Sequence, residues 1–186
     1  LAQLFIVVDG GEGGTGAAPM SLMDCVGLPI RESLPLVVDM IARHGLKGRI
    51  RVIASGKLVT PSEAAMALCL GADFINSARG FMFALGCIQA MKCNKNTCPT
   101  GITTHDKNLQ RGLVVTDKAE RVARYQQGME KEVAVIAHSC GAAEPRLLRL
   151  SVIANALSNA IKFSRPETTI DAEIGHKGRD VILRIR

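Results

Sequence analysis

The chain has 186 residues, enough for one domain or slightly more, and its 47% of hydrophobic residues is typical of a globular protein and excludes a disordered one. It has no apolar run long enough to span a membrane and no recognisable secretion signal, so we expect a cytoplasmic protein that does not bind membranes. Most of the net charge of +6 comes from residues 146–186, and no Lys/Arg stripe with interleaved aromatics occurs, which argues against nucleic-acid binding.

Strands, loops and helices alternate along the first half of the chain. The strands are short apolar runs, and one helix begins with the capping signal Thr60-Pro61-Ser62-Glu63. This alternation predicts right-handed βαβ units and an α/β fold, and the unbroken apolar character of the strands predicts a parallel sheet covered on both faces. In chain order we expect a strand at 4–8, a helix at 31–44, a strand at 50–54, a helix from Thr60 to Leu70, a strand at 73–76 and a helix at 80–91.

The second half of the chain contains no further strand–helix–strand unit. The sequence predicts, in order, a charged segment at 98–116, a helix at 117–138, a boundary at Pro145, a helix at 147–163, and two strands, 168–174 and 180–185, that form a hairpin around Lys177 and Gly178. We therefore expect two units, residues 1–146 and residues 147–186.

A glycine-rich loop follows the first expected strand and contains Gly11, Gly13 and Gly14. Its G-x-G-x-x-G pattern is also found in dinucleotide-binding domains, but Pro19 and Pro29 interrupt the stretch where such a domain would continue as a helix. The loop is either a flexible connection or a strand-end loop whose backbone amides approach a cofactor or substrate. We favour the second interpretation, because ordering so many glycines has a high entropic cost.

Two turns at neighbouring strand ends each combine free backbone amides with a cation. They are Ser55, Gly56 and Lys57 after the second expected strand, and Ala78, Arg79 and Gly80 after the third. Such a pair of turns forms the usual phosphate site of a parallel barrel. Each turn alone could equally be an ordinary strand–helix connection with a solvated side chain.

Three cysteines, Cys87, Cys93 and Cys98, lie within twelve residues. Thiolates in a short irregular loop are typical ligands of an iron–sulfur cluster, whereas a zinc site more often shows two C-x2-C pairs. Three thiols suit a three-iron cluster or a four-iron cluster with one open or distant ligand. Cys69 and Cys140 are candidates for that ligand, although each could also be a buried free thiol.

The motifs together resemble the FMN-binding domain of glutamate synthase, and most closely the archaeal-type glutamate synthase-like proteins. The likeness covers about residues 1–146 and is carried by the segments 9–19, 84–87 and 93–101. It implies the C-terminal portion of a (β/α)8 TIM barrel, roughly its last three units, with an iron–sulfur loop. It further implies an FMN-dependent oxidoreductase that forms glutamate from 2-oxoglutarate and ammonia-derived nitrogen.

The resemblance implies a role for each group of residues. The three cysteines correspond to the ligands of a 3Fe-4S cluster that relays electrons to FMN, and the glycine loop lies beside the flavin and the substrate. The turns 55–57 and 78–80 correspond to the two FMN-phosphate loops, although the larger enzymes have two glycines in the first and Gly-Thr or Gly-Ser in the second. The implied partners are 2-oxoglutarate, ammonia or glutamine, and an electron-donor protein or an NAD(P)H-oxidising subunit.

The C-terminal residues resemble a different family. Residues 155–164 are similar to the N-box of a sensor histidine kinase ATPase domain, in which the asparagines help to hold Mg-ATP, and this implies such a role for Asn155 and Asn159. The leading hypothesis is a fragment of a glutamate synthase-type enzyme. The alternatives are an ATP-binding fragment of a histidine kinase and a metal-binding fragment without catalysis.

Overall fold

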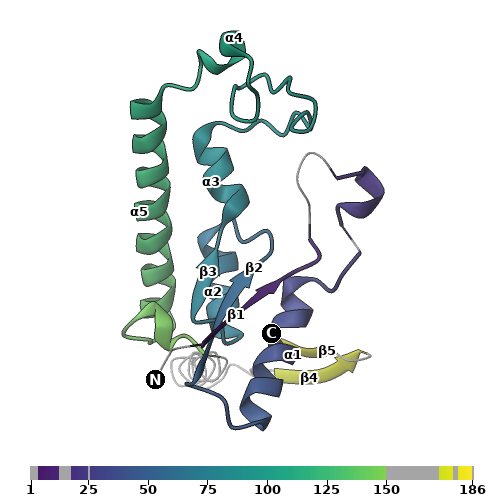
Figure 1. The fold of residues 1–186 in the computed structure, drawn as a ribbon. Coiled ribbons are helices and arrows are strands. Elements are labelled where there is room, and N and C mark those ends of the chain that lie inside the picture. The colour runs from purple at the N-terminus through teal and green to yellow at the C-terminus, as the bar shows by residue number, and fades with distance from the viewer. Residues whose placement is uncertain (1–3, 13–17, 25, 150–171, 178–179, 186) are drawn as a thin grey trace.

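The computed structural model describes residues 4–12, 18–24, 26–149, 172–177 and 180–185. Figure 1 shows an α/β arrangement in which helices pack beside a short parallel sheet. The elements are β1 (Leu4–Asp9), the 3₁₀ helix η1 (Met20–Leu22), α1 (Ile30–Arg43), β2 (Ile50–Ser55), α2 (Pro61–Cys69), β3 (Phe74–Asn76), α3 (Ala78–Leu85), α4 (Lys107–Gln110), α5 (Val115–Ser139), the 3₁₀ helix η2 (Pro145–Leu147), β4 (Ala172–Lys177) and β5 (Asp180–Ile185). No helix in the described ranges is both long and apolar enough to cross a membrane.

The sheet consists of three parallel strands in the order β1-β2-β3. Val7 pairs with Ile53, and Ile53 in turn pairs with Phe74, so the strands stay in register across the sheet. The predicted parallel βαβ units are therefore confirmed. Because the strands are parallel, their carboxyl ends lie along one edge, where loops that carry functional residues can meet.

The predicted capping signal of α2 is confirmed in full. The Thr60 hydroxyl accepts a hydrogen bond from the Glu63 amide, and the Glu63 carboxylate accepts from the amides of Thr60 and Val59, both at 2.9 Å. Burial raises the pKa of the Glu63 carboxyl, but the hydrogen bonds from Thr60 and Val59 outweigh this effect and hold the pKa below its usual value. The ionised side chain thus fixes the start of α2 directly after the turn at residues 55–59.

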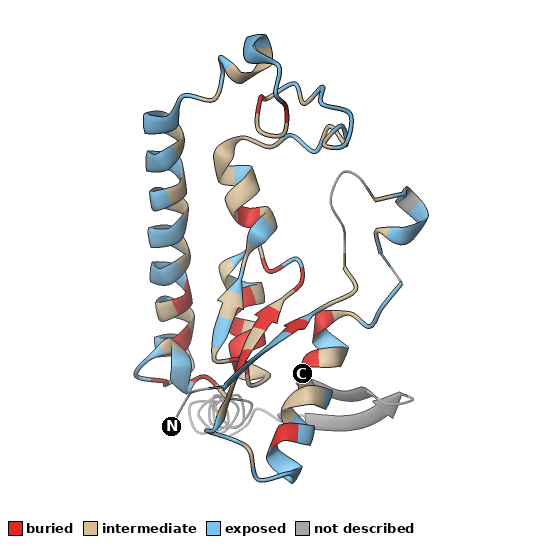
Figure 2. Cartoon of the chain, viewed as in Figure 1, coloured by how far each residue is buried: buried red, intermediate tan, exposed pale blue. Residues whose placement is uncertain are grey.

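Two aliphatic clusters form the core (Figure 2). The first lies between α1 and the sheet and includes Leu34, Val52 and Ala54, all buried. The second lies between α2 and α5 and includes Leu68 and Ala137. Helix α2 contributes to both clusters and therefore joins the sheet to α5.

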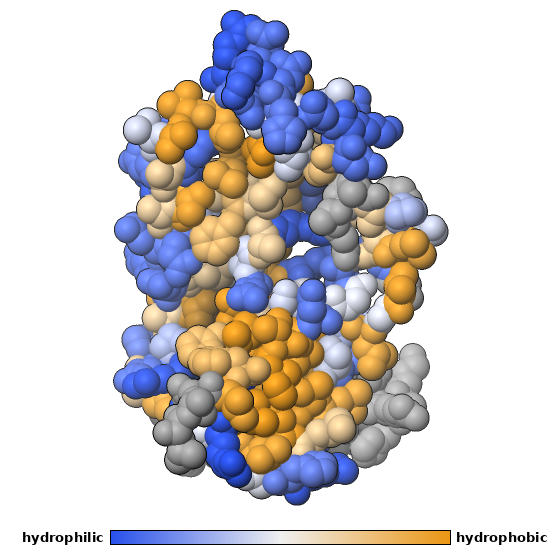
Figure 3. All heavy atoms as spheres, in the orientation of Figure 1, coloured by the Kyte–Doolittle hydropathy of each residue, from blue (hydrophilic) through white to orange (hydrophobic). Residues whose placement is uncertain are grey.

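The opposite face of the sheet is exposed. Phe5, Val7 and Phe74 lie on this face and are 53%, 56% and 51% exposed, and the rings of Phe5 and Phe74 lie 6.2 Å apart. Figure 3 shows a broad apolar surface over the strands. The prediction that both faces of the sheet are covered is therefore wrong for this chain, because the described residues place helices on one face alone.

The helix predicted at 80–91 starts two residues earlier than expected and is shorter. Helix α3 ends at Leu85, because Gly86 adopts a left-handed conformation with φ of 102° that terminates the helix. Residues 87–106 then form an irregular loop that contains the three clustered cysteines, called here the cysteine loop. The helix predicted at 117–138 is confirmed as α5, with a start two residues earlier than expected.

The predicted C-terminal hairpin is confirmed in part. Strands β4 and β5 are antiparallel, and Lys177 pairs with Asp180. Strand β4 begins at Ala172, and residues 168–171 of the predicted strand lie outside the described residues. Most of the helix predicted at 147–163 lies outside the described residues, as do Asn155 and Asn159, while Pro145–Leu147 form η2.

Candidate functional site

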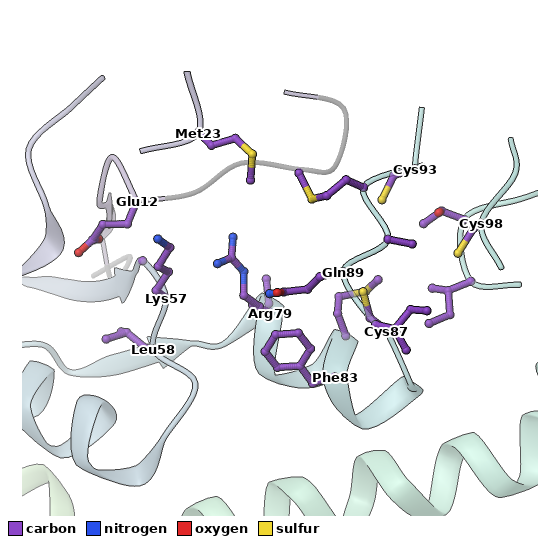
Figure 4. A pocket seen from close by; sticks show the side chains of 18 of the residues that line it. Glu12, Met23, Lys57, Leu58, Arg79, Phe83, Cys87, Gln89, Cys93 and Cys98 are labelled. Carbon is purple, nitrogen blue, oxygen red and sulfur yellow. The ribbon is translucent and has the colours of Figure 1, made fainter. Parts of the chain in front are cut away.

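A cavity of about 790 Å³ lies at the carboxyl ends of the three parallel strands. Its walls come from the loop after β1, the turn after β2, the start of α3 and the cysteine loop (Figure 4). The volume is in the range of sites that bind small molecules and cofactors. The cavity brings together most of the sites that were predicted separately from the sequence.

The described part of the glycine-rich loop is bound tightly to its neighbours. The Gly10 amide donates to the Ser55 carbonyl at 2.8 Å, and the Gly11 amide donates to the Leu28 carbonyl at 2.9 Å. A Cβ atom on Gly11 would lie 2.5 Å from the Cα atom of Gly27, so Gly11 permits a close contact between two backbone segments. Gly11 does not line the cavity, whereas its neighbours Gly10 and Glu12 do. The predicted site residues Gly13 and Gly14 lie outside the described residues.

The turn after β2 places Ser55, Gly56 and Lys57 on the cavity wall. Gly56 has φ of 143°, and Lys57 has a left-handed φ of 47°, which is uncommon for a residue with a side chain. The Lys57 ammonium donates to Asp24 at 2.6 Å and so connects this turn to the loop after β1. The predicted phosphate turn therefore faces the cavity with its cation already engaged by a carboxylate.

The three residues of the turn after β3 do not all face the cavity. Ala78 and Arg79 line the cavity, but Gly80 is buried and faces α5. A Cβ atom on Gly80 would lie 1.9 Å from the Tyr125 hydroxyl, which itself donates to the Val59 carbonyl at 2.7 Å. Gly80 allows α3 to pack against α5, and its predicted contact with a phosphate stays a prediction.

Arg79 and Lys57 bring two positive charges to the same part of the cavity (Figure 4). Lys57 is paired with Asp24, whereas Arg79 has no ion-pair partner within the described residues. Positively charged side chains on a cavity wall are suited to bind a phosphate group. The apolar side chains of Met23, Leu58 and Phe83 also line the cavity and are suited to contact a flat ring system.

The three clustered cysteines, Cys87, Cys93 and Cys98, line the wall of the cavity contributed by the cysteine loop (Figure 4). All three are half-buried free thiols. Burial raises the pKa of the Cys98 thiol, but hydrogen bonding, first of all from the Thr100 hydroxyl, outweighs burial and lowers this pKa to about 6. The Cys98 sulfur lies 3.3 Å from the Thr100 hydroxyl. A lowered pKa favours the thiolate form of Cys98, which is the form that binds metals.

The chemistry of these donors fits an iron–sulfur cluster or another soft metal centre. As placed here, however, no three His, Cys, Asp or Glu side chains in the described ranges are grouped closely enough to hold a metal ion. The other candidate ligands, Cys69 and Cys140, pack against the core cluster between α2 and α5 and do not line the cavity. Burial, together with Cys140, raises the pKa of Cys69, as expected for an inert thiol.

Side-chain hydrogen bonds hold the cysteine loop in its irregular path. The Asn96 carboxamide oxygen accepts from the His105 amide at 2.6 Å, and the buried Thr104 hydroxyl donates to the Asn96 carbonyl at 2.6 Å. Asn96, Gln89 and Met91 all have left-handed backbone conformations, with φ between 55° and 57°. Such strained residues are frequent at functional sites. Of these three residues, Gln89 and Met91 line the cavity.

Several lining residues were missed by the sequence analysis. Glu12, Asp24 and Gln89 reach the site or its edge, although no motif rule assigns them a role. The position of Glu12 inside the glycine motif was the one available signal. Glu12 contacts Ile30 and Asp24 contacts Lys57, and each partner is distant in sequence, which explains why local patterns did not reveal these two residues.

Comparison with known proteins identifies relatives for most of the chain. The family model described as "Conserved region in glutamate synthase" matches residues 2–143. The glutamate synthase large subunit-like protein YerD of Bacillus subtilis (strain 168) is 47% identical over 141 residues, which are 76% of this chain and 27% of that protein. The archaeal glutamate synthase (NADPH) of Methanocaldococcus jannaschii is 34% identical over 136 residues, which are 73% of this chain and 27% of that protein. The glutamate synthase (NADPH) large chain of Azospirillum brasilense is 32% identical over 73% of this chain and 9% of that protein.

Proposed function

Because the chain belongs to the glutamate synthase family, we propose that residues 1–146 bind the phosphate end of FMN and ligate a 3Fe-4S cluster in a glutamate synthase-type oxidoreductase. The chain spans about a quarter of the length of the first two relatives. The complete reaction, reductive formation of glutamate from 2-oxoglutarate and ammonia-derived nitrogen, is therefore proposed for an enzyme of the relatives' length. The observation that carries the proposal is the single cavity that holds both the two cations and the three cysteines.

The residues that would contact FMN are proposed from their position and charge. Ser55, Gly56 and Lys57 would face the phosphate from one side, and Ala78 and Arg79 would face it from the other. Bound FMN would supply hydride chemistry for the reduction of an imine. The cations of this chain would bind and orient the phosphate, and the apolar wall would exclude water from the ring.

The residues that would ligate the cluster are Cys87, Cys93 and Cys98. A 3Fe-4S cluster would supply one-electron transfer to the flavin. The lowered pKa of Cys98 supports this role, because a cluster ligand must be a thiolate. The electrons would come from a donor protein or an NAD(P)H-oxidising subunit, and the nitrogen from ammonia or glutamine.

We further propose that the three parallel strand–helix units are part of a (β/α)8 barrel. The parallel register of β1, β2 and β3 and the site at their carboxyl ends support this architecture. Residues 147–186 are proposed as a separate unit, since the match to the family ends at residue 143 and an antiparallel hairpin follows.

The proposal is tested by placing the chain in a protein of the relatives' length. In this extended chimera, the segment of the Bacillus subtilis relative that matches this chain is replaced by the complete 186-residue chain. We expect the chimera to purify with FMN. We also expect Arg79→Glu to weaken FMN binding by about tenfold or more, because it places a negative charge beside the phosphate.

A matched substitution, Arg49→Glu, tests whether charge reversal as such affects the protein. Arg49 is exposed and does not line the cavity, so its reversal should leave FMN affinity unchanged. Equal FMN affinity in the unsubstituted chimera and the Arg79→Glu variant would show that the phosphate binds elsewhere.

A further inference from the structure

Glu12 caps a helix that begins 18 residues after it. Its carboxylate oxygen Oε2 accepts a hydrogen bond from the backbone amide of Ile30 at 2.9 Å. Ile30 is the first residue of α1, and Pro29 before it provides no side-chain cap. The first amides of a helix have no partner within the helix and attract negative charge, so the carboxylate stabilises this end of α1.

The same carboxylate oxygen fills a space that two glycines leave open. A Cβ atom on Gly10 would lie 2.2 Å from Glu12 Oε2, and a Cβ atom on Gly56 would lie 2.6 Å from it. Gly10 belongs to the loop after β1, and Gly56 belongs to the phosphate turn after β2. Any larger side chain at either position would displace the carboxylate, so the three residues form one packed unit.

Glu12 therefore connects three segments at the same end of the cavity. It contacts the start of α1 through Ile30 and lies against the phosphate turn at Gly56, while the neighbouring Gly10 amide bonds to Ser55 at 2.8 Å. Figure 4 shows its carboxylate pointing away from Lys57 and Arg79. The negative charge of Glu12 thus lies at the helix end, and Glu12 pairs with neither Lys57, whose partner is Asp24, nor Arg79.

We infer that Glu12 is a positioning residue for phosphate binding, which holds the turn 55–57 in the conformation that presents its amides and Lys57 to a phosphate group. This inference rests on the proposed function. Glu12 is not expected to contact the phosphate itself, because the Glu12 carboxylate faces α1 and would repel an anion.

The test measures how much the phosphate group contributes to flavin binding. Dissociation constants for FMN and for riboflavin, which lacks the phosphate, are measured by calorimetry with the complete chain in the extended chimera. The ratio of the riboflavin constant to the FMN constant reports the phosphate contribution alone. A general loss of folding changes the two constants together and leaves their ratio unchanged.

Three substitutions are compared by this ratio. We expect Glu12→Ala to lower it by about tenfold, the effect of one lost hydrogen bond to a charged group. Glu12→Gln keeps an oxygen that can accept from Ile30 and should restore most of the ratio. Glu32→Ala is the matched control, since Glu32 lies exposed in the first turn of the same helix and should leave the ratio unchanged.

If Glu12→Ala does not fold, Glu12→Asp gives the same comparison, because the charge is kept while the shorter side chain cannot reach Ile30. A ratio that stays at the unsubstituted value in Glu12→Ala or Glu12→Asp would overturn the inference about Glu12. Equal affinities for FMN and riboflavin in the unsubstituted chimera would instead contradict the proposed phosphate site.

Discussion

At the scale of single residues, the described glycines of the site motifs differ in whether they line the cavity. Gly56 lines the cavity, whereas Gly11 and Gly80 permit close contacts with Gly27 and Tyr125. The sequence could not separate these roles, because a motif shows where glycines occur but not which distant segment approaches them.

The packing role of Gly80 makes a direct prediction. Gly80→Ala should lower the stability of the extended chimera by about 1–3 kcal/mol, because the new methyl group overlaps the Tyr125 hydroxyl. The matched control is Gly128→Ala in α5, where a Cβ atom meets nothing within 4 Å and alanine should stabilise the helix by about 1 kcal/mol. Thermal unfolding measures both effects, and equal midpoints for the two variants would contradict the assigned contact.

The cysteines make a second prediction at this scale. Cys93→Ser should abolish incorporation of iron and sulfide after anaerobic reconstitution of the extended chimera, because a hydroxyl is a poor ligand for a soft cluster. Cys140→Ser should retain both, since Cys140 packs against the core away from the cavity. Iron content that is the same in unsubstituted protein and Cys93→Ser would rule out Cys93 as a ligand.

At the scale of elements, the capping box of α2 predicts how stability depends on pH. The pKa of Glu63 is lower in the folded protein than in the unfolded chain, so its contribution is complete above the unfolded value and is lost as the pH falls through the folded value. Glu63→Gln should therefore destabilise the extended chimera at neutral pH by about 1 kcal/mol. Its disadvantage should shrink as the pH is lowered below the usual range of a glutamate, which denaturant unfolding at several pH values can follow. A constant difference between the two proteins at all pH values would contradict this role.

The helix start and the strands that were predicted correctly are those whose sequence signals lie within or directly beside the element. The start of α2 and the three parallel strands follow from capping residues and apolar runs. Helix α3 was predicted too long, since the apolar residues after Leu85 continue the pattern while Gly86 ends the helix. The path of the cysteine loop was not predictable, because contacts such as that of Asn96 with His105 determine it.

At the scale of the whole molecule, the exposed sheet face predicts the behaviour of the chain by itself. Phe5, Val7 and Phe74 form an apolar surface on a sheet that has three strands within the described residues, and exposed apolar faces and sheet edges promote association. We expect the isolated 186-residue chain to aggregate or to bind a hydrophobic dye strongly, and to bind FMN weakly. The extended chimera should be soluble. A soluble isolated monomer with one sharp thermal transition and bound FMN would contradict this expectation.

The central proposal is that one cavity of this chain serves both FMN and an iron–sulfur cluster. Its most direct test is the content of flavin, iron and sulfide in a single preparation of the extended chimera, measured alongside Arg79→Glu and Cys93→Ser. We predict that the unsubstituted protein contains all three, that Arg79→Glu loses flavin but keeps iron and sulfide, and that Cys93→Ser loses iron and sulfide. A protein that contains zinc in place of iron, or that contains no flavin, would contradict the account.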